Sequence, residues 1–370
     1  MLFRSRRFNR ELGTEPARVL QRVGAAFNAT TWLDRTSYYE VLPVEHLDLA
    51  AEVESDRMRA ALLREEDLAS ERTVILNELD MGENEPFDLL MKSSFAHAFL
   101  EHPYHHPTIG WRGDVEAMSV GVLQSFYDTY YHPDNATVVV AGDVAEEAIL
   151  ETVERAFGHL GRSKSQLPRP SAREGEQRGE RRFQIHRGGE VGCLVLTWRI
   201  PRGLDPDLPA LTVLTQILSD GVTSRLHQRL VETNRCLSVY AYAFELHDPG
   251  VFQVFATLAP GVPHSEVEGA IREEIDAVAR DAPSVDELAR AKIQTRTDLA
   301  FHHESPARIV SGVTEAVAMG DWRRFVHELE LVSAVTADEV RSVVARYLRE
   351  RSLTVGWFVP EPAGGAPEGT

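Results

Sequence analysis

Apolar and polar residues along this chain follow helical and strand-like periods in turn. Residues 23–43, VGAAFNATTWLDRTSYYEVLP, are rich in Thr, Trp, Tyr and Val with partial alternation, which predicts one or two strands. Helical periods follow over 44–65, over Asp67–Met81 and over 119–132. The apolar run NATVVVAGDV (135–144) predicts a buried strand that ends in a Gly-Asp turn. Shorter helices are predicted within 1–22, over ENEPFDLLMKSSFAHAF and over AEEAILETVERAFGHL.

A polar segment at 161–182, GRSKSQLPRPSAREGEQRGERR, separates two such patterns. It carries proline and charge with almost no apolar residue, which is typical of a linker between domains. Beyond it the chain predicts strands over VGCLVLTWRIP, CLSVYAYAFEL, GVFQVFATLAP and LTVGWFVP, and helices over DPDLPALTVLTQILSDG, over TSRLHQRLVET and over three or four segments of 264–349. The tail 361–370, EPAGGAPEGT, is predicted to be disordered because it cannot bury enough apolar surface.

The two halves share an internal repeat. A gap-free match that begins by placing Ser119 on Thr336 pairs Leu123 with Val340, Ser125 with Ser342, Tyr130 with Tyr347, Thr137 with Thr354 and Val138 with Val355. Each half therefore closes with the same helix-then-strand unit, with the linker between the halves. We interpret the chain as a duplicated α+β domain, with boundaries at 1–161 and 183–360.

The helix predicted over Asp67–Met81 carries two carboxylates within its apolar face. Glu71 and Glu78 project in nearly the same direction at about 100° per residue. Leu68, Ile75 and Leu79 flank them on one side and Val74 and Met81 on the other, while Arg72, Thr73, Asn77 and Asp80 form the opposite polar face. Burying a carboxylate is costly unless a cation or hydrogen-bond donors meet it. Either arginines and backbone amides, or a metal ion, are expected to meet this pair.

Composition narrows the classes of function. With 370 residues and 43% apolar content the chain can bury a large core. A net charge of -18, without a basic patch laced with aromatic residues, makes nucleic acid an improbable partner. Cys193 and Cys236 each lie in a strand-like run and are interpreted as core residues. No apolar run reaches membrane-spanning length and MLFRSRRFNREL does not form a signal peptide, so a cytoplasmic location is expected, although an export signal could lie upstream.

Three histidines, His102, His105 and His106, lie close together in the loop HPYHHPTIGW. Neighbouring histidines are compatible with metal binding. The loop is flanked by Pro103 and Pro107 and has no carboxylate or cysteine at ligand spacing, so a packed turn is the favoured interpretation.

Several ordered motifs resemble the M16 zinc peptidases, the group of pitrilysin, insulin-degrading enzyme and the mitochondrial processing peptidase. They are FNATTWLDRTSYY, ERTVILNELDM, HPYHHPTIGW, YYHPDNATVVVAGDV and DGVTSRLHQRL, and the resemblance runs from Met1 to about Pro360. It implies an α+β fold of two homologous domains, each a mostly antiparallel sheet covered by helices, that form a clamshell around a peptide. It also implies a possible homodimer, or a heterodimer with an M16 homologue.

The resemblance implies a zinc ion bound by H-x-x-E-H on a helix and by a glutamate further along the chain. By that match Glu78 is the third zinc ligand and Glu71 is the glutamate that supports it. No H-x-x-E-H occurs in this sequence, so no catalytic residue is assigned, and the general base is expected upstream of Met1. With one carboxylate ligand the chain as numbered is expected to bind zinc weakly and not to hydrolyse peptides alone.

Relatives typically continue their metal motif with Met-Leu-Phe, and this chain begins MLF. The numbering is therefore expected to start within the metal-binding helix. Either the start codon has been assigned to an internal methionine, or the gene has lost its front end. The first explanation is favoured, because loss of the opening strands would leave a sheet edge unpaired in a protein of about 5–15 kcal/mol stability.

Other matched positions concern the substrate. The resemblance places Asn28 and Ala29 on the strand to which an extended peptide adds. An arginine and a tyrosine that grip substrate in the family fall on Val231 and Ser238 here, which leaves that clamp open to question. Arg235 or Tyr240, a residue or two away, could substitute, while Arg225 is interpreted as a packing residue at a helix start.

Two functions remain open at this point. In the first, the full gene product is a zinc endopeptidase that encloses peptides or unfolded segments. In the second, the chain is a non-catalytic subunit that binds peptide or supports an active partner. Retention of Glu71 and Glu78 favours the first, and the change at Val231 and Ser238 favours the second. The preferred peptide is not specified by these residues.

Overall fold

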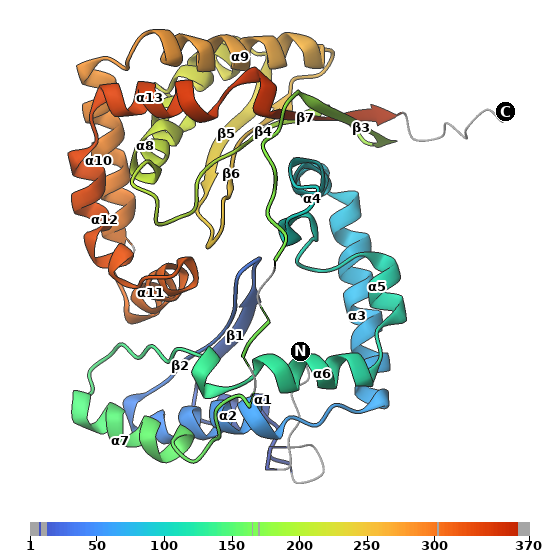
Figure 1. Ribbon diagram of the computed structural model, residues 1–370, viewed down its shortest axis with the longest axis vertical. Coiled ribbons are helices and arrows are strands. Elements are labelled where there is room, and N and C mark those ends of the chain that lie inside the picture. The colour runs from blue at the N-terminus through green and yellow to red at the C-terminus, as the bar shows by residue number, and fades with distance from the viewer. Residues whose placement is uncertain (1–6, 9–12, 165, 169–170, 302, 362–370) are drawn as a thin grey trace, which may run out of the picture. The chain divides into compact units, whose positions relative to one another are not determined.

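The computed structural model describes residues 7–8, 13–164, 166–168, 171–301 and 303–361 (Figure 1). The chain forms two compact units, unit 1 from Met1–Met81, Thr108–Ser171 and His303–Thr314, and unit 2 from Gly82–Pro107, Ala172–His302 and Glu315–Thr370. These units interleave in the sequence, whereas the predicted domains 1–161 and 183–360 are contiguous. The predicted tail, apart from Glu361, and the first three residues lie outside the described residues.

Unit 1 contains one β-hairpin and a set of helices. Its elements are α1 (Pro16–Arg22), β1 (Ala26–Thr31), β2 (Thr36–Val41), η1 (Val44–His46), α2 (Leu47–Ala60), most of α3 (Glu65–Asn84), α5 (Arg112–Ala117), α6 (Val120–Tyr130), η3 (Pro133–Asn135), α7 (Glu146–Phe157) and the first part of α11 (Pro306–Met319). β1 and β2 pair antiparallel, from Ala26 opposite Val41 to Thr31 opposite Thr36. The buried cluster beneath them is small and centres on Phe8, Leu20 and Val53.

Unit 2 is built on a five-stranded sheet. Its elements are α4 (Pro86–Ala98), η2 (Pro103–His105), β3 (Arg181–Gly188), β4 (Cys193–Arg199), α8 (Leu208–Ser219), the π-helical turn η4 (His227–Val231), β5 (Cys236–Phe244), β6 (Val251–Leu258), α9 (His264–Arg280), α10 (Val285–Phe301), the end of α11, α12 (Arg323–Ala334), α13 (Ala337–Tyr347), η5 (Glu350–Ser352) and β7 (Leu353–Glu361). The strand order is β3-β7-β4-β6-β5, in which only the β3–β7 pair is parallel.

Helices cover both faces of this sheet. Residues of α8, α9 and α13 form the larger core with one face, and α4 contributes Leu90 to a smaller core with Cys193, Val195 and Phe358 on the other face. β4 and β6 are buried almost throughout because they lie inside the sheet between these layers, whereas β5, at an edge, alternates between buried and exposed residues. Both cysteines are buried and free, as expected.

The internal repeat is visible in the helix ends. Ser119 caps α6 by accepting the backbone N–H of Val122 at 3.3 Å. Thr336 caps α13 in the same way through the N–H of Glu339, whose carboxylate reaches back to Thr336. The predicted match of these two segments is therefore reproduced at their first turns.

The predicted strand over 135–144 is wrong. Residues 136–141 lie outside regular structure and pair with no strand among the residues described, and Val138 is 48% exposed. Its repeat partner in β7, Val355, is 1% exposed and lies between β3 and β4. A strand requires a neighbour for its backbone groups, and unit 1 offers this segment none in the part of the chain that the structure describes.

Two smaller differences concern strands and helices in unit 2. β3 begins at Arg181, within the predicted linker, because its alternating residues RRFQIHRG pair along one side with β7. Residues 264–349 contain five helices, α9 to α13, where three or four were predicted.

Candidate functional site

The helix α3 does not bury the carboxylate pair as predicted. Glu71 is half-buried and Glu78 is exposed. Val74 and Met81, expected to cover Glu78 on one side, are 56% and 72% exposed, whereas Leu79 on the other side is buried. The apolar arc of this helix is therefore half-covered in unit 1, and Glu78 lies in its uncovered half.

The described residues do not fit a zinc ion by themselves. Among them no group of three His, Cys, Asp or Glu side chains is close enough to hold a metal. Glu78 would supply one carboxylate, and a catalytic zinc site needs three protein ligands with one open position.

The residues matched to a substrate strand lie on a free edge. β1 pairs with β2 alone among the described strands, and Asn28 is exposed on it. The Asn28 side chain accepts the backbone N–H of Ala29 at 2.8 Å. This strand therefore offers one unpaired side, along which an extended peptide could add.

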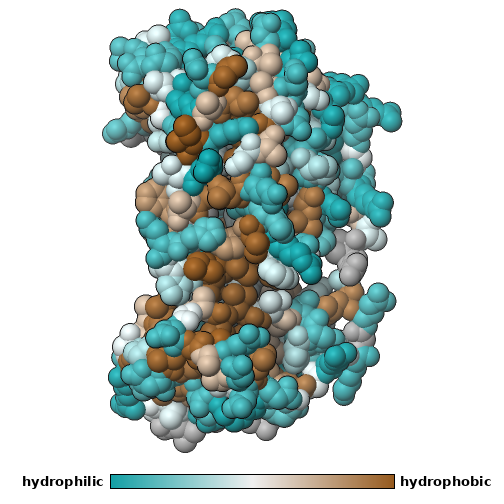
Figure 2. Space-filling model, turned by 90° about the vertical axis from the view of Figure 1, so that its left-hand side faces the viewer, coloured by the Kyte–Doolittle hydropathy of each residue, from teal (hydrophilic) through white to brown (hydrophobic). Residues whose placement is uncertain are grey.

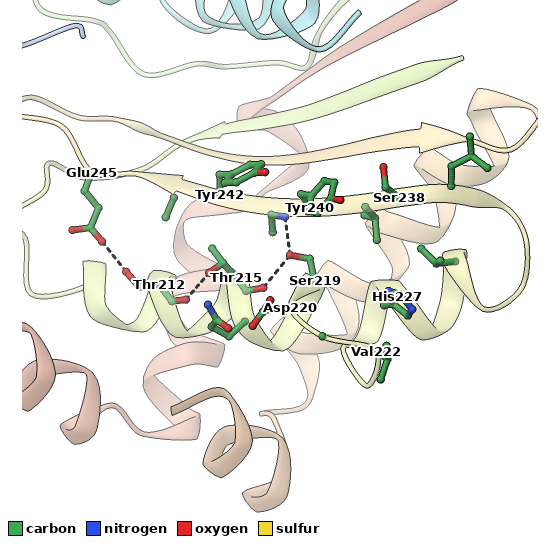
Figure 3. A pocket seen from close by; sticks show the side chains of 17 residues that line it. Thr212, Thr215, Ser219, Asp220, Val222, His227, Ser238, Tyr240, Tyr242 and Glu245 are labelled. Atoms are coloured by element: carbon green, nitrogen blue, oxygen red, sulfur yellow. Dashed lines mark hydrogen bonds between the residues drawn. The ribbon is translucent and has the colours of Figure 1, made fainter. Parts of the chain in front are cut away.

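Unit 2 contains a groove of about 580 Å³ between α8 and the edge strand β5. One wall is a polar stripe of α8 at helical spacing, namely Thr212, Thr215, Gln216 and Ser219, followed by Asp220 just after the helix. The other wall is the strand run 237–243, and His227 and Val231 close one end. Figure 3 shows the helix running alongside the strand, with Ser219 hydrogen-bonded to the backbone of β5 and Thr212 to Glu245. The helical spacing of these polar residues was a signal that the sequence analysis missed.

Of the four residues considered in connection with a substrate clamp, three line this groove. Val231 and Ser238 both line it, and so does Tyr240, which is half-exposed. Arg235 pairs with Glu266 at 3.1 Å and is not among the lining residues.

Arg225 has the structural role expected of it. Its Nε and Nη2 donate to the two carboxylate oxygens of Glu287 at 2.7 and 3.1 Å. This bidentate pair fastens the segment before η4 to the start of α10.

The histidine loop is a packed turn, as favoured. His102 is buried, with Nε2 3.2 Å from an oxygen of Asp248 and Nδ1 accepting the N–H of Tyr104. Glu174, which the sequence analysis placed in the linker without a role, accepts the N–H groups of residues 100, 101 and 102 at 2.9, 2.8 and 3.1 Å. Burial raises the pKa of Glu174, but the three N–H donors together lower it by more, so the pKa lies below its ordinary value.

A second carboxylate pair, in unit 1, was not anticipated. Burial first, and then a hydrogen bond that the protonated Glu40 donates to Glu54, raise the pKa of Glu40 from 4.5 to about 9. The Nη2 atom of Arg57 lies 2.8 Å from Oε1 of Glu54, and the same guanidinium group lies over the ring of Tyr38. The raised pKa favours the protonated form of the Glu40 carboxyl at neutral pH.

The comparisons with known proteins agree with the family resemblance of the motifs. A family model described as insulinase (peptidase family M16) matches residues 5–110, and one described as the peptidase M16 inactive domain matches residues 117–295. An uncharacterised zinc protease of Streptomyces coelicolor is 30% identical over 363 residues, which cover 96% of this chain and 78% of that protein. This chain belongs to the M16 peptidase family. It carries both family domains, in an α+β fold.

Further proteins are similar to this chain in sequence or in fold. The zinc protease PqqE of Helicobacter pylori is 26% identical over 348 residues, covering 93% of this chain and 78% of that protein. The crystal structure of a protease from Helicobacter pylori superposes with a TM-score of 0.90 at 24% identity, covering 94% of this chain and 85% of that chain. A chain of complex III from Candida albicans superposes with a TM-score of 0.79 at 14% identity, covering 96% of this chain and 89% of that chain. At these identities the superpositions show the fold alone. None of the helices in the described residues is both long enough and apolar enough to cross a bilayer.

Proposed function

We propose that this M16 protein is a zinc-dependent endopeptidase whose metal site is completed by residues outside those described. The observation that carries the proposal is the uncovered part of unit 1. The α6 residue Phe126 is 55% exposed, whereas Val343, which occupies the same place in the repeat, is 1% exposed. Val138 and Val355 differ in the same sense, and Figure 2 shows brown apolar surface on unit 1, in the lower part of the view.

The repeat indicates what would cover that surface. In unit 2 the strand β7 is flanked by β3 and β4, which precede α8 in the chain. Among the described residues, the matching segment 136–141 of unit 1 has no strand on either side of it. Among the same residues, Glu78 has no further metal ligands beside it. A preceding segment with two strands followed by a helix, the order of β3, β4 and α8 in unit 2, would supply the missing strand neighbours. If that helix carried H-x-x-E-H, it would also supply the missing zinc ligands.

In this proposal Glu78 provides the carboxylate ligand, Glu71 supports it, and β1 holds an extended peptide through its free edge beside Asn28. When bound, zinc would supply a polarised water for amide hydrolysis. The substrate class is a peptide or an unfolded segment, enclosed between the two domains as in a clamshell. A cytoplasmic location and a dimer with a second M16 chain remain predictions, tested by cell fractionation and sedimentation.

The alternative is a non-catalytic subunit that binds peptide. The absence of arginine and tyrosine at Val231 and Ser238 favours it, since those positions line the groove of unit 2 without offering a cation or a phenol.

The deciding experiment begins with the in-frame coding sequence upstream of Met1. The chain 1–370 and the chain extended by that sequence are purified, and zinc content and cleavage of an internally quenched peptide are measured. The proposal expects weak zinc binding and no cleavage for 1–370, with about one zinc per chain and cleavage for the extended protein. Glu78→Gln in the extended protein should abolish both, while Glu65→Gln, an exposed control on the same helix, should leave both unchanged.

An upstream stop codon, or an upstream sequence without the two histidines, would favour the subunit. Tight stoichiometric zinc in the chain 1–370 would contradict the proposed ligand set.

A further inference from the structure

The inner face of the β1–β2 hairpin carries polar side chains beside an apolar one. Phe27 of β1 packs on the small cluster that contains Val53 of α2. The register partner of Phe27 in β2 is Glu40, and Tyr38 lies two residues away on the same face. Both side chains are partly buried, so β2 meets its neighbours through polar groups that need partners.

These polar groups connect the hairpin to α2 and to the end of α6. Glu40 is hydrogen-bonded to Glu54 of α2, and Nη2 of Arg57 lies 2.8 Å from Oε1 of Glu54. The Arg57 guanidinium also lies 4.3 Å from the ring centre of Tyr38. The Tyr38 hydroxyl is 2.6 Å from that of Tyr131, the residue that follows α6. A connected set of hydrogen bonds and charges therefore docks the hairpin on α2.

The hydrogen bond between Glu40 and Glu54 requires a proton. An ionised carboxylate only accepts hydrogen bonds, so two carboxyl groups pair in this way only while one of them is protonated. Arg57 lies beside Glu54 and stabilises its ionised form, which leaves the proton on Glu40. Loss of that proton replaces the hydrogen bond by repulsion between two carboxylates that share one arginine.

The charges that act on Glu40 come from α2. Burial, the hydrogen bond to Glu54 and then the charge of Glu54 raise the pKa of Glu40 from 4.5 to about 9, and Arg57 lowers it by less. On α6, Asp128 is paired with Arg59 of α2, with 3.1 Å between Oδ1 and Nη2.

The tyrosine beside Glu40 keeps its proton over the same range. Burial raises the pKa of Tyr38, and burial also raises the pKa of Tyr127 on α6. The hydrogen bond between Tyr38 and Tyr131 therefore persists while Glu40 titrates. This makes Glu40 the group through which pH acts on the contact between β2 and α2.

The pH range of this effect follows from the two protonation states of Glu40. Below about pH 4.5 the carboxyl is protonated whether or not the hairpin is docked, and the stabilisation is complete. Between about pH 4.5 and about pH 9 docking takes up one proton, so its equilibrium constant falls by up to about tenfold per pH unit. Above about pH 9 the docked form loses the proton as well.

We propose that Glu40 and Glu54 form a proton-dependent latch, which holds the β1–β2 hairpin on α2 and releases it as the pH rises. The latch is built from residues of unit 1 and needs neither zinc nor substrate. Its consequence for activity rests on the function proposed above. Because a peptide is proposed to add along the free edge of β1, a hairpin that is docked for less of the time should bind peptide more weakly.

The test follows amide hydrogen exchange in the full chain 1–370 with a chelator present. Rates are measured between about pH 6 and about pH 8.5 and divided by the intrinsic rate at each pH. Protection of the hairpin amides is expected to fall by about tenfold per pH unit in the wild-type protein. Glu40→Gln, whose amide N–H can donate to Glu54 at any pH, should keep protection high and independent of pH. Glu45→Gln, an exposed control shortly after β2, should retain the wild-type slope.

The helix α7 reports unfolding of unit 1 as a whole. Its amides should stay more protected than those of the hairpin at every pH, because the hairpin is expected to open alone. One common corrected rate for the hairpin and α7 would link the proton to unfolding of the whole unit, and the latch would be wrong.

Further outcomes would also overturn the latch. They are a flat profile in the wild-type protein, an equal slope in Glu40→Gln, or a lost slope in Glu45→Gln. Glu54→Gln is a second variant that does not depend on the folding of Glu40→Gln, and it should reduce the slope because burial alone then raises the pKa of Glu40. An unchanged slope in Glu54→Gln would contradict the role of the pair. Since neither zinc nor cleavage is measured, the latch and the endopeptidase proposal can each fail without the other.

Discussion

The ion pair between Arg225 and Glu287 allows a quantitative test of what holds unit 2 together around the groove. Glu287 receives Arg225 through both carboxylate oxygens and also accepts the N–H and hydroxyl of Ser284 at 2.9 Å each, which caps the start of α10. The hydrogen bond from Arg225 is the largest cause of its low pKa, which falls from 4.5 to about 2. That shift corresponds to an upper bound of about 3.4 kcal/mol.

Glu287→Gln should therefore destabilise the folded protein at pH 7. The side chain is 22% exposed, so solvent screening reduces the expected loss to about 1–2 kcal/mol. Because the folded-state pKa lies below the unfolded one, this stabilisation is complete above about pH 4.5 and is lost as the pH falls toward about 2. The deficit of the variant should shrink accordingly between pH 7 and pH 3.5.

The assay is urea unfolding followed by tryptophan fluorescence and circular dichroism, with hydrogen exchange of α10 to assign the transition to unit 2. Asp286→Asn is the matched control, since Asp286 is exposed in the same first turn and loses only its interaction with the helix dipole. The ion pair does not stabilise unit 2 as expected if Glu287→Gln lowers the free energy of unfolding at pH 7 by no more than Asp286→Asn does. The same conclusion follows if the loss caused by Glu287→Gln is as large at pH 3.5 as at pH 7.

Three further substitutions test other parts of the fold by urea unfolding. Glu40→Gln should raise the unfolding free energy of unit 1 at pH 7 by about 1–2 kcal/mol. With a folded-state pKa of about 9, Glu40 must be protonated on folding at pH 7, and the free-energy cost of this protonation grows as the pH rises from about 4.5. A lower unfolding free energy of the variant at pH 7 would contradict this. Glu268→Gln should cost about 2–4 kcal/mol, since this buried carboxylate receives two arginines and the indole N–H of Trp357; a cost within that of an exposed control would refute it. Gly250→Ala should cost about 1–3 kcal/mol, because its Cβ would lie 2.0 Å from the carbonyl oxygen of Phe244; unchanged stability would show that the hairpin adjusts freely.

Local periodicity was sufficient to predict most helices and the inner strands. The bounds predicted for α3 and α8 lie within about three residues of the structure, and the prediction over 44–65 contains the shorter α2, because each helix has an apolar stripe of its own. β4 and β6 were recognisable as predominantly apolar runs, since both faces of an inner strand are covered.

Features that depend on distant partners were not predictable in this way. β3 was not predicted as a strand, and its first two residues lie in the predicted linker, because it forms by pairing with β7, far along the chain. Glu174 reads as one more linker charge until the loop at 100–102 presents three N–H groups to it. Sequence periodicity reflects only neighbours along the chain and carries no information about such long-range contacts. The β3 strand and the role of Glu174 were therefore missed for the same reason.

The wrong strand and the exposed Glu78 have a common origin. Val138 and Val355 belong to matched helix-then-strand segments, and both helices begin with the same kind of cap. One segment becomes an inner strand and the other has no strand partner among the described residues, which means that neighbours decide the outcome more than the segment itself does. Glu78 follows the same rule, because an apolar arc buries a carboxylate only where a second layer lies on it. A partner that pairs with residues 136–141 would therefore supply the neighbour that β3 and β4 give to β7.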